Sequence, residues 1–343
     1  MKFFPTWLLR VVAVFLCVLG IVFLSGCNRG RGRVLEVAYV SGVQVSLRDR
    51  VAAVYEKAGV VKNGDRVEVL DHDRRFVKVR TATGATGWME QRYLVSQEVF
   101  DQLQRLTKEN ANDPVQGQAT ARNDTNLHVE PGRDTEHLYQ ILLGDKVSLL
   151  KRGTAEKPGA AAGPRPGTKT GEKKAPVPMV EDWWLVRDSH DRVGWVLGRM
   201  VDLDVPIEVA QYAEGQRIVA YFVLNQVQDG DKKVAQYLTI VTEPKDGQPF
   251  DFNQIRVFTW NVKRRRYETA YRERMPGVLP VRVSQENFDK EGVLPVFAIR
   301  VQDDSGNVSE RKYKLNTPIV RRVYAPGEEP VHAPPKRAAR RKR

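Results

Sequence analysis

The residues best suited to chemistry in this sequence are two cysteines, Cys17 and Cys27, and five histidines. The histidines form no His-Glu-x-x-His zinc motif, and His128 and His137 lie nine residues apart without an acidic pattern that would complete a metal site. The sequence also has no phosphate-binding glycine loop and no serine-nucleophile elbow. We therefore expect a chain that is not an enzyme, with no catalytic residue, no metal and no cofactor.

Cys27 has the clearest chemical context of these residues. Lys2 and Arg10 precede an apolar run over Val11–Leu24, which ends in Leu24-Ser25-Gly26-Cys27. A basic start, an apolar run and small residues before a cleavage point are typical of a secretory signal. As a helix the run spans about 21 Å, which is short for a hydrocarbon core of about 30 Å.

Leu-Ser-Gly-Cys resembles the signal-peptidase II site of bacterial lipoproteins, in which the cysteine is acylated. The resemblance implies a signal peptide over 1–26, a lipid-carrying Cys27, and a mature chain outside the cytoplasm that has no thiol nucleophile. Palmitate and the membrane would then be partners through the anchor. An uncleaved anchor helix over Phe3–Leu24 is the alternative, although Pro5 and Arg10 interrupt it. Arg29 and the two arginines that follow it work against ordinary export.

The net charge of +13 is concentrated outside the parts expected to fold. Basic residues cluster near both ends and in the Pro/Gly-rich stretch 151–178, and the remainder is close to neutral. This distribution argues against nucleic-acid binding. Two interpretations of the basic tail at 326–343 remain open, namely contact with anionic head groups or wall polymers, and a solvated tail without a partner.

A duplicated pattern is the clearest structural signal. Leu47 and Gly64 are separated by 17 residues, as are Leu127 and Gly144. Each copy continues with alternating apolar residues and a Gly-Trp pair that ends at Trp88 or Trp195. Short alternating segments separated by Gly-Asp turns predict five or so strands per copy, and these close most economically as a small barrel.

The second copy carries an insertion of 27 residues relative to the first. It coincides with a stretch rich in proline, glycine and lysine, which predicts a disordered insertion over 153–178. Both flanks match the first copy, so we interpret it as a loop between two strands.

The order Leu-Arg/His, Gly-Asp-x-Val, Val-x-Val-Arg and Gly-Trp resembles bacterial SH3 (SH3b) domains. The resemblance covers about residues 36–96 and 120–203, less than half of the chain. It implies SH3-like barrels that act as noncatalytic targeting modules for peptidoglycan stem peptides or for protein partners.

Four tryptophans are the candidate ligand-binding residues. Trp88 and Trp195 occupy matching places, where either barrel anchoring or ligand contact is expected. Trp183 and Trp184 are adjacent, so on a strand they point to opposite faces. We therefore expect at most one of them in the core unless a loop covers the other, and we expect an exposed tryptophan beside the basic loop.

A helix and linker are predicted over 97–119, between the two copies. Val99, Phe100, Leu103 and Leu106 form a helical stripe after Ser96, a plausible N-cap. The stripe is expected to pack across the first barrel or between the two.

The remaining region, 207–325, is predicted to be rich in β-structure. Apolar and β-branched runs separated by turns such as Asp229-Gly230 suggest seven or eight strands in an antiparallel β-sandwich or a pair of meander sheets. A strongly basic hairpin tip at 263–266 is expected either to contact an anion or to be a solvated turn.

Taken together, the sequence predicts an all-β chain with two small SH3-like barrels, one short helix between them and a sandwich-like domain. The expected function is a membrane-anchored, noncatalytic binding protein of the cell envelope that contacts peptidoglycan or peptides. The alternative is an envelope assembly or scaffold lipoprotein that binds other proteins. The mature part is expected in the cell envelope outside the cytoplasm, on the periplasmic side of the membrane if the cell is Gram-negative, and no nucleic acid is expected as a partner.

Overall fold

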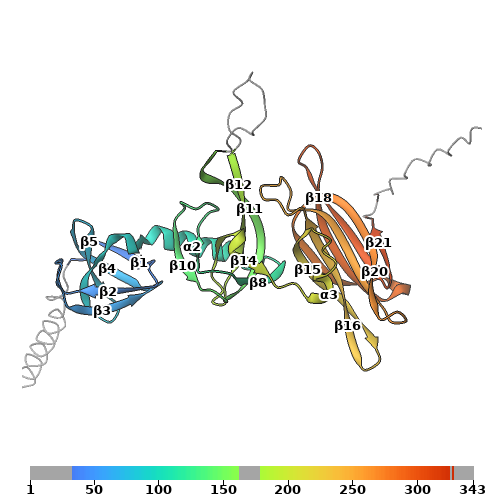
Figure 1. Cartoon of the computed structure of the whole chain (residues 1–343), viewed down its shortest axis with the longest axis horizontal. Coiled ribbons are helices and arrows are strands. Elements are labelled where there is room, and N and C mark those ends of the chain that lie inside the picture. The colour runs from blue at the N-terminus through green and yellow to red at the C-terminus, as the bar shows by residue number, and fades with distance from the viewer. Residues whose placement is uncertain (1–32, 162–177, 325–326, 328–343) are drawn as a thin grey trace, which may run out of the picture. The chain divides into compact units, whose positions relative to one another are not determined.

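The computed structural model in Figure 1 describes residues 33–161, 178–324 and 327. It divides into two compact units, Met1–Ser96 and Gln97–Arg343, which are treated separately below. The predicted signal peptide, Cys27, most of the 153–178 insertion and nearly all of the basic tail lie outside the described residues. Within the described residues, no helix is long and apolar enough to cross a membrane.

The first unit is a seven-stranded antiparallel sheet with the order β3-β2-β6-β5-β4-β1-β7. Its core contains small and medium apolar side chains, among them Val40, Leu47 and Met89, which the alternation along each strand directs to one face. The elements are β1 (Glu36–Val40), β2 (Gln44–Arg48), β3 (Lys57–Lys62), β4 (Arg66–Asp73), β5 (Phe76–Thr81), β6 (Thr86–Glu90), the 3-10 turn η1 (Gln91–Tyr93) and β7 (Leu94–Ser96).

The second unit begins with a helix and a sheet of the corresponding order, β10-β9-β13-β12-β11-β8-β14. Every strand takes the place of its counterpart seven numbers earlier. The elements are α2 (Gln97–Glu109), β8 (Gly117–Ala121), β9 (Thr125–His128), β10 (His137–Ile141), β11 (Lys146–Ala161), β12 (Pro178–Arg187), β13 (Val193–Leu197), η2 (Gly198–Met200) and β14 (Val201–Leu203).

The repeated Gly-Asp turn has the same construction in both sheets. Gly64 and Gly144 adopt left-handed φ angles of 85° and 89°, which glycine tolerates without steric cost. In each turn the following aspartate accepts a backbone hydrogen bond from three residues earlier, at 2.8 Å in the first turn and 2.9 Å in the second. The repeat in the sequence therefore encodes one turn geometry that is used twice.

Helix α2 covers one face of the second sheet. Leu106 packs against the buried cluster that contains Leu150 and Leu185. The Thr107 hydroxyl accepts a hydrogen bond from the Val193 amide at 3.0 Å. The sheet is thus enclosed on a face that its strand alternation alone would leave exposed.

The prediction of a disordered insertion over 153–178 is wrong for its first part. Residues 153–161 continue β11, where Thr154 pairs with Asp182 and Glu156 with Val180 on β12. Gly153 serves packing in this hairpin, because a Cβ there would lie 2.7 Å from the Trp195 ring. Glycine content suggested flexibility, whereas the glycine is needed for close approach.

The C-terminal region is a single sheet of seven strands in sequential order, β15 to β21. The strands therefore form one continuous meander, yellow to red in Figure 1, and not a pair of separate meander sheets. The expected sandwich-like packing stays a prediction. The long strand β18 makes the meander continuous, because its first part pairs with β17 and its last part with β19. The elements are α3 (Ile207–Ala210), β15 (Arg217–Asp229), β16 (Lys232–Thr242), β17 (Phe252–Asn261), β18 (Arg266–Asn287), η3 (Asp289–Glu291), β19 (Val293–Gln302), β20 (Val308–Asn316) and β21 (Ile319–Val323).

This meander folds back on itself. Thr317, after β20, donates a hydrogen bond at 2.8 Å to the fully buried Gln236 of β16. Gln285 of β18 donates to the carbonyl of Leu224 on β15 at 3.2 Å. Distant strands of one sheet therefore share a core, which includes the fully buried Phe252 and Phe297.

Buried polar contacts join this meander to the sheet before it. Gln116 exchanges two hydrogen bonds with the backbone of Val281, at 2.8 and 3.2 Å. Arg152 donates to Asp182 at 2.6 Å and to Asp251 at 3.1 Å. Burial opposes the charge on Arg152, but hydrogen bonds and attraction from both carboxylates outweigh it and raise its pKa. Burial raises the pKa of Asp251 despite these same contacts.

Candidate functional site

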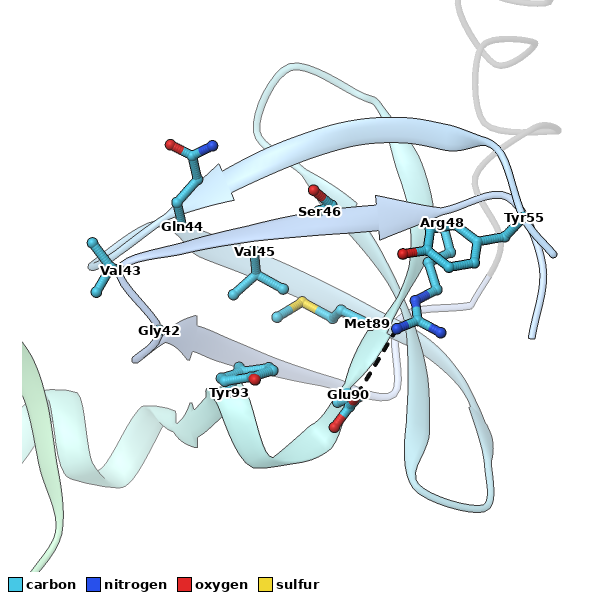
Figure 2. Close-up of a pocket in the computed structure, with 10 residues that line it drawn as sticks. All are labelled: Gly42, Val43, Gln44, Val45, Ser46, Arg48, Tyr55, Met89, Glu90 and Tyr93. Atoms are coloured by element: carbon cyan, nitrogen blue, oxygen red, sulfur yellow. Dashed lines mark ion pairs between the residues drawn. The ribbon is translucent and has the colours of Figure 1, made fainter. Parts of the chain in front are cut away.

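The first sheet contains a cleft of about 370 Å³, shown in Figure 2. It lies mainly along β2 and the end of β6, with contributions from the loop before β3 and from η1. The lining residues are Gly42, Val43, Gln44, Val45, Ser46, Arg48, Tyr55, Met89, Glu90 and Tyr93. A volume in this range is typical of small-ligand sites and suits a short peptide end.

One part of the cleft is apolar. Val45, Met89 and Tyr93 lie close together in Figure 2. Met89 is almost completely buried in the core of the sheet, and Val45 and Tyr93 are partly buried against that core. The core therefore supplies a firm apolar wall against which a small aliphatic group can pack.

The other end of the cleft carries opposite charges. A guanidinium nitrogen of Arg48 lies 3.9 Å from a carboxylate oxygen of Glu90. The other carboxylate oxygen of Glu90 is 2.9 Å from Arg92. Arg92 thus neutralises most of the Glu90 charge, and the net charge of the three groups is positive.

Aromatic rings hold the Arg48 side chain in place. Its guanidinium carbon lies 4.2 Å from the ring centroid of Tyr55 and 5.0 Å from that of Phe76. Such stacking leaves the N–H groups at the edge of the guanidinium plane available. Among the described residues, the Arg48 guanidinium has no hydrogen-bond acceptor, because its contact with Glu90 is too long to be a hydrogen bond.

No tryptophan is among the described residues that line this cleft. Trp88 is the cross-strand partner of Arg48, but it is not a lining residue. Trp183 and Trp184 are 2% and 9% exposed, so the expected exposed tryptophan beside the basic loop is not found. Trp195 is half-buried under α2. Whether any of the four contacts a ligand stays a prediction.

The equivalent place in the second sheet is built differently. His128 pairs with Trp195 as Arg48 pairs with Trp88, so the two residues are structural counterparts. The His128 ring lies 5.0 Å from that of His137 and 5.2 Å from that of Trp183. A charged position in the first sheet is therefore a packed aromatic cluster in the second.

This cluster keeps His128 neutral at pH 7. Burial and the nearby His137 imidazole lower the pKa of His128 to about 4, against a weaker opposing effect from Thr135. The Nδ1 atom lies 2.9 Å from the Thr135 hydroxyl. No group of three His, Cys, Asp or Glu residues suited to a metal occurs within residues 33–161 and 178–324, so the two histidines lack the carboxylate that a metal site would need.

Sequence reasoning missed Arg48, Tyr55, Glu90 and Tyr93. One signal was present, because Arg48 stands in the Leu-Arg motif whose second copy reads Leu-His. A charge that differs between two copies of a motif marks a position where their functions differ. The contribution of Tyr55 and Tyr93 depends on loop and turn geometry, which the sequence pattern did not contain.

Comparison with known proteins supports the resemblance of the first copy to bacterial SH3 domains. Residues 44–95 match the family model of the bacterial SH3 domain. The matched segment begins at β2 and ends within β7, and it contains nearly all of the cleft. A search of curated proteins finds no match to this chain.

Three solved structures align with most of the chain at low similarity. They are NlpC2 from Trichomonas vaginalis, with 9% identity over 84% of this chain and 95% of that chain and a TM-score of 0.17; an NlpC/P60 family protein from Bacillus cereus ATCC 10987, with 10% identity over 82% and 95% and a TM-score of 0.23; and NlpC1 from Trichomonas vaginalis, with 8% identity over 82% and 89% and a TM-score of 0.18.

These structures contradict the expectation that the chain is not an enzyme. The exclusion of enzyme activity rested on the absence of sequence motifs, and it is withdrawn because the aligned structures are NlpC and NlpC/P60 family proteins. At TM-scores of 0.17 to 0.23, the likeness assigns no catalytic residue and no activity to this chain. What the chain shares with known proteins is a bacterial SH3 domain at residues 44–95.

Proposed function

We propose that this chain is a binding protein of the bacterial cell envelope whose first sheet holds a peptide, either from peptidoglycan or from a protein. The observation that carries the proposal is the cleft in the segment that matches the bacterial SH3 domain, with an apolar wall at Val45 and Met89 and a guanidinium at Arg48. A concave site with a few polar groups on an apolar base is the usual form of a ligand site.

The proposal includes a lipid anchor at Cys27. It is supported by the order of charged, apolar and small residues before that cysteine. Metabolic labelling with a palmitate analogue should label the full chain, and Cys27→Ala should abolish the label and leave the segment 1–26 uncleaved. A Cys17→Ala variant is the matched control and should remain labelled. A wild-type chain that takes no label and keeps residues 1–26 would favour the uncleaved helix instead.

The proposed arrangement is two SH3-like barrels followed by the C-terminal meander as a spacer or second binding surface. Its support is the shared strand order of the first two sheets and their common Gly-Asp turn. The buried contacts of Gln116 and Arg152 support a firm connection between the second sheet and the meander.

Binding to purified sacculi by the full chain in detergent tests the peptidoglycan ligand. Ser46 is an exposed residue that lines the cleft, and a Ser46→Trp substitution would place a bulky ring at the β2 side of the cleft without removing a core contact. The equivalent residue of the second sheet is Asn126, so Asn126→Trp is the matched control. We expect Ser46→Trp to reduce retention at least tenfold and Asn126→Trp to leave it unchanged. Equal retention of both variants would place the ligand elsewhere.

A protein partner is the second candidate, and a specific surface favours it. Val54 is 85% exposed, and Tyr55 and Val60 are also exposed on and before the edge strand β3. Exposed apolar groups beside an unpaired strand edge are typical of a surface that binds a protein partner by pairing with one of the partner's strands. Photocrosslinking in cells from position 54 should then trap one defined protein, whereas recovery of muropeptides alone would exclude this candidate.

A further inference from the structure

We propose that Arg48 is a carboxylate-binding position, and that the ligand of the cleft is a peptide with a free C-terminal carboxylate next to a small apolar side chain. This inference rests on the proposed peptide-binding function of the first sheet. It names the chemical group that the cleft selects.

The state of the guanidinium is the first support. The Arg48 guanidinium is stacked near Tyr55 and Phe76 and has no hydrogen-bond acceptor among the described residues. A guanidinium matches a carboxylate through two parallel N–H···O bonds, and a side chain that is already ordered loses less entropy when these bonds form. The aromatic contacts therefore prepare Arg48 for a planar anion.

The local charge is the second support. Glu90 would repel a carboxylate if it were unpaired, but Arg92 lies 2.9 Å from it. Lys57 is the cross-strand neighbour of Arg48 on β3 and adds positive charge on the other side. The charged groups around Arg48 therefore favour an anion over a cation.

The geometry of the cleft determines what stands next to the carboxylate. Val45, Met89 and Tyr93 line the same cleft as Arg48, and Figure 2 shows them in a row leading away from it. With about 370 Å³ available, the cleft has room for a short peptide end and not for several large side chains. Exposed Gln44 and Ser46 stand along β2, where they can contact the peptide backbone.

The second sheet lacks this chemistry at the same place. The counterpart of Arg48 is the buried, neutral His128, and Leu197 stands where the first sheet has Glu90. A neutral ring that is already in contact with Thr135 has little capacity for a carboxylate. Of the first two sheets, therefore, only the first can select a carboxylate at this position.

The methionines allow a direct test on the full chain in detergent. The chain has five methionines, one of which, Met89, lines the cleft, while Met200 occupies the place of Tyr93 in the second sheet. With methyl-labelled methionine, titration of N-acetyl-Ala-Ala should shift the Met89 signal and leave the Met200 signal unchanged. The N-acetyl-Ala-Ala carboxamide should bind about 10-fold or more weakly, as expected for the loss of a charge-assisted contact.

Variants assign the effect to Arg48. Arg48→Gln should make the acid and the amide bind equally, and Arg48→Lys should retain part of the preference because it keeps the charge but not the planar fork. Lys62→Gln removes an exposed charge from the same sheet and should preserve the full preference. Retained dispersion of the Met89 and Met200 signals shows that each variant is folded.

The possible outcomes distinguish a failure of the carboxylate assignment from a failure of the proposed binding function. If the acid and the amide shift Met89 with equal affinity, the carboxylate assignment is overturned while peptide binding stands. If neither peptide shifts Met89 at millimolar concentration but sacculi are still retained through the cleft, the chosen peptide end is wrong and the carboxylate assignment is again overturned. If sacculi and peptides both fail to bind and photocrosslinking traps no protein, the proposed function itself fails.

Discussion

Arg48 and His128 occupy the same position in two sheets of equal strand order, each opposite a tryptophan on the neighbouring strand. Arg48 is only partly buried and lines an open cleft, whereas His128 is 9% exposed and packs against His137 and Trp183. The same strand order therefore carries a charged cleft in the first sheet and a closed aromatic cluster in the second. The following predictions test both uses and the contacts that support them.

Acidification should destabilise the second unit through His128. Its pKa is about 4 in the folded chain and about 6.5 in an unfolded chain, so between these values the unfolded state binds more protons than the folded state. The stabilising contribution is complete above pH 6.5 and is lost as the pH falls toward 4. The free energy of unfolding should decrease by about 3 kcal/mol across this window. Urea denaturation at a series of pH values measures it.

A variant without the titrating ring identifies the source of this pH dependence. His128→Gln should flatten the profile between pH 4 and 6.5, at some cost to stability at neutral pH. His190 has a side chain that is 71% exposed, and His190→Gln should retain the wild-type slope. An unchanged slope in His128→Gln would show that other groups cause the acid sensitivity.

Removing Arg152 should strongly destabilise the junction in the second unit. Its side chain is 6% exposed and is bonded to Asp182, which is 7% exposed, and to Asp251. Arg152→Met would leave buried Asp251 without its cation and Asp182 with Arg217 as its remaining cation, and removing one partner of a buried ion pair typically costs about 3–5 kcal/mol. The pair Arg122–Asp202 is exposed, with both side chains at 58%, so Arg122→Met should cost less than about 1 kcal/mol. Equal effects in urea denaturation would contradict the assigned role of burial.

Gly277 should tolerate no side chain, although it lies in a strand. A Cβ at this position would overlap the ring of the fully buried Phe252, with the ring Cε1 atom at 2.8 Å. Gly277→Ala should cost about 1–3 kcal/mol through overpacking. Phe252→Leu in the same chain should recover part of this loss. At Gly59 a Cβ would have its nearest neighbour at 3.5 Å, and thermal unfolding of Gly59→Ala should be close to wild type.

The ion pair between Arg133 and Glu181 should restrain the loop after β9. Two contacts of 2.7 and 2.6 Å join these side chains, and the Arg133 hydrogen bond lowers the pKa of Glu181. Arg133→Gln should speed amide exchange over residues 129–136 with a loss of no more than about 1 kcal/mol in global stability. Glu130 is exposed in the same loop, and Glu130→Gln should leave exchange unchanged. Equal exchange in the two variants would show that the loop is held by other contacts.

The strands of the first two sheets were predictable because their signals are local. Alternating apolar residues determine which face of a strand is buried, and Gly64-Asp65 and Gly144-Asp145 carry their turn geometry within four residues. The prediction of an exposed tryptophan was wrong because its exposure depends on contacts with residues far away in the chain. Trp183 and Trp184 do alternate, but the face that should have been exposed is covered by contacts with His128 and by α2 beside Leu185.

The sequence by itself determined the mostly β composition, the duplicated Gly-Asp turns and the bacterial SH3 match at residues 44–95, because each depends on residues close together in the chain. Only the tertiary structure decided that the third region is one continuous meander, and that Arg48, Tyr55 and Glu90 meet in a cleft while His128 is enclosed. Strand pairing, loop closure and helix docking join residues that are far apart in the chain. Their energies depend on which surfaces meet, and no local pattern records that choice.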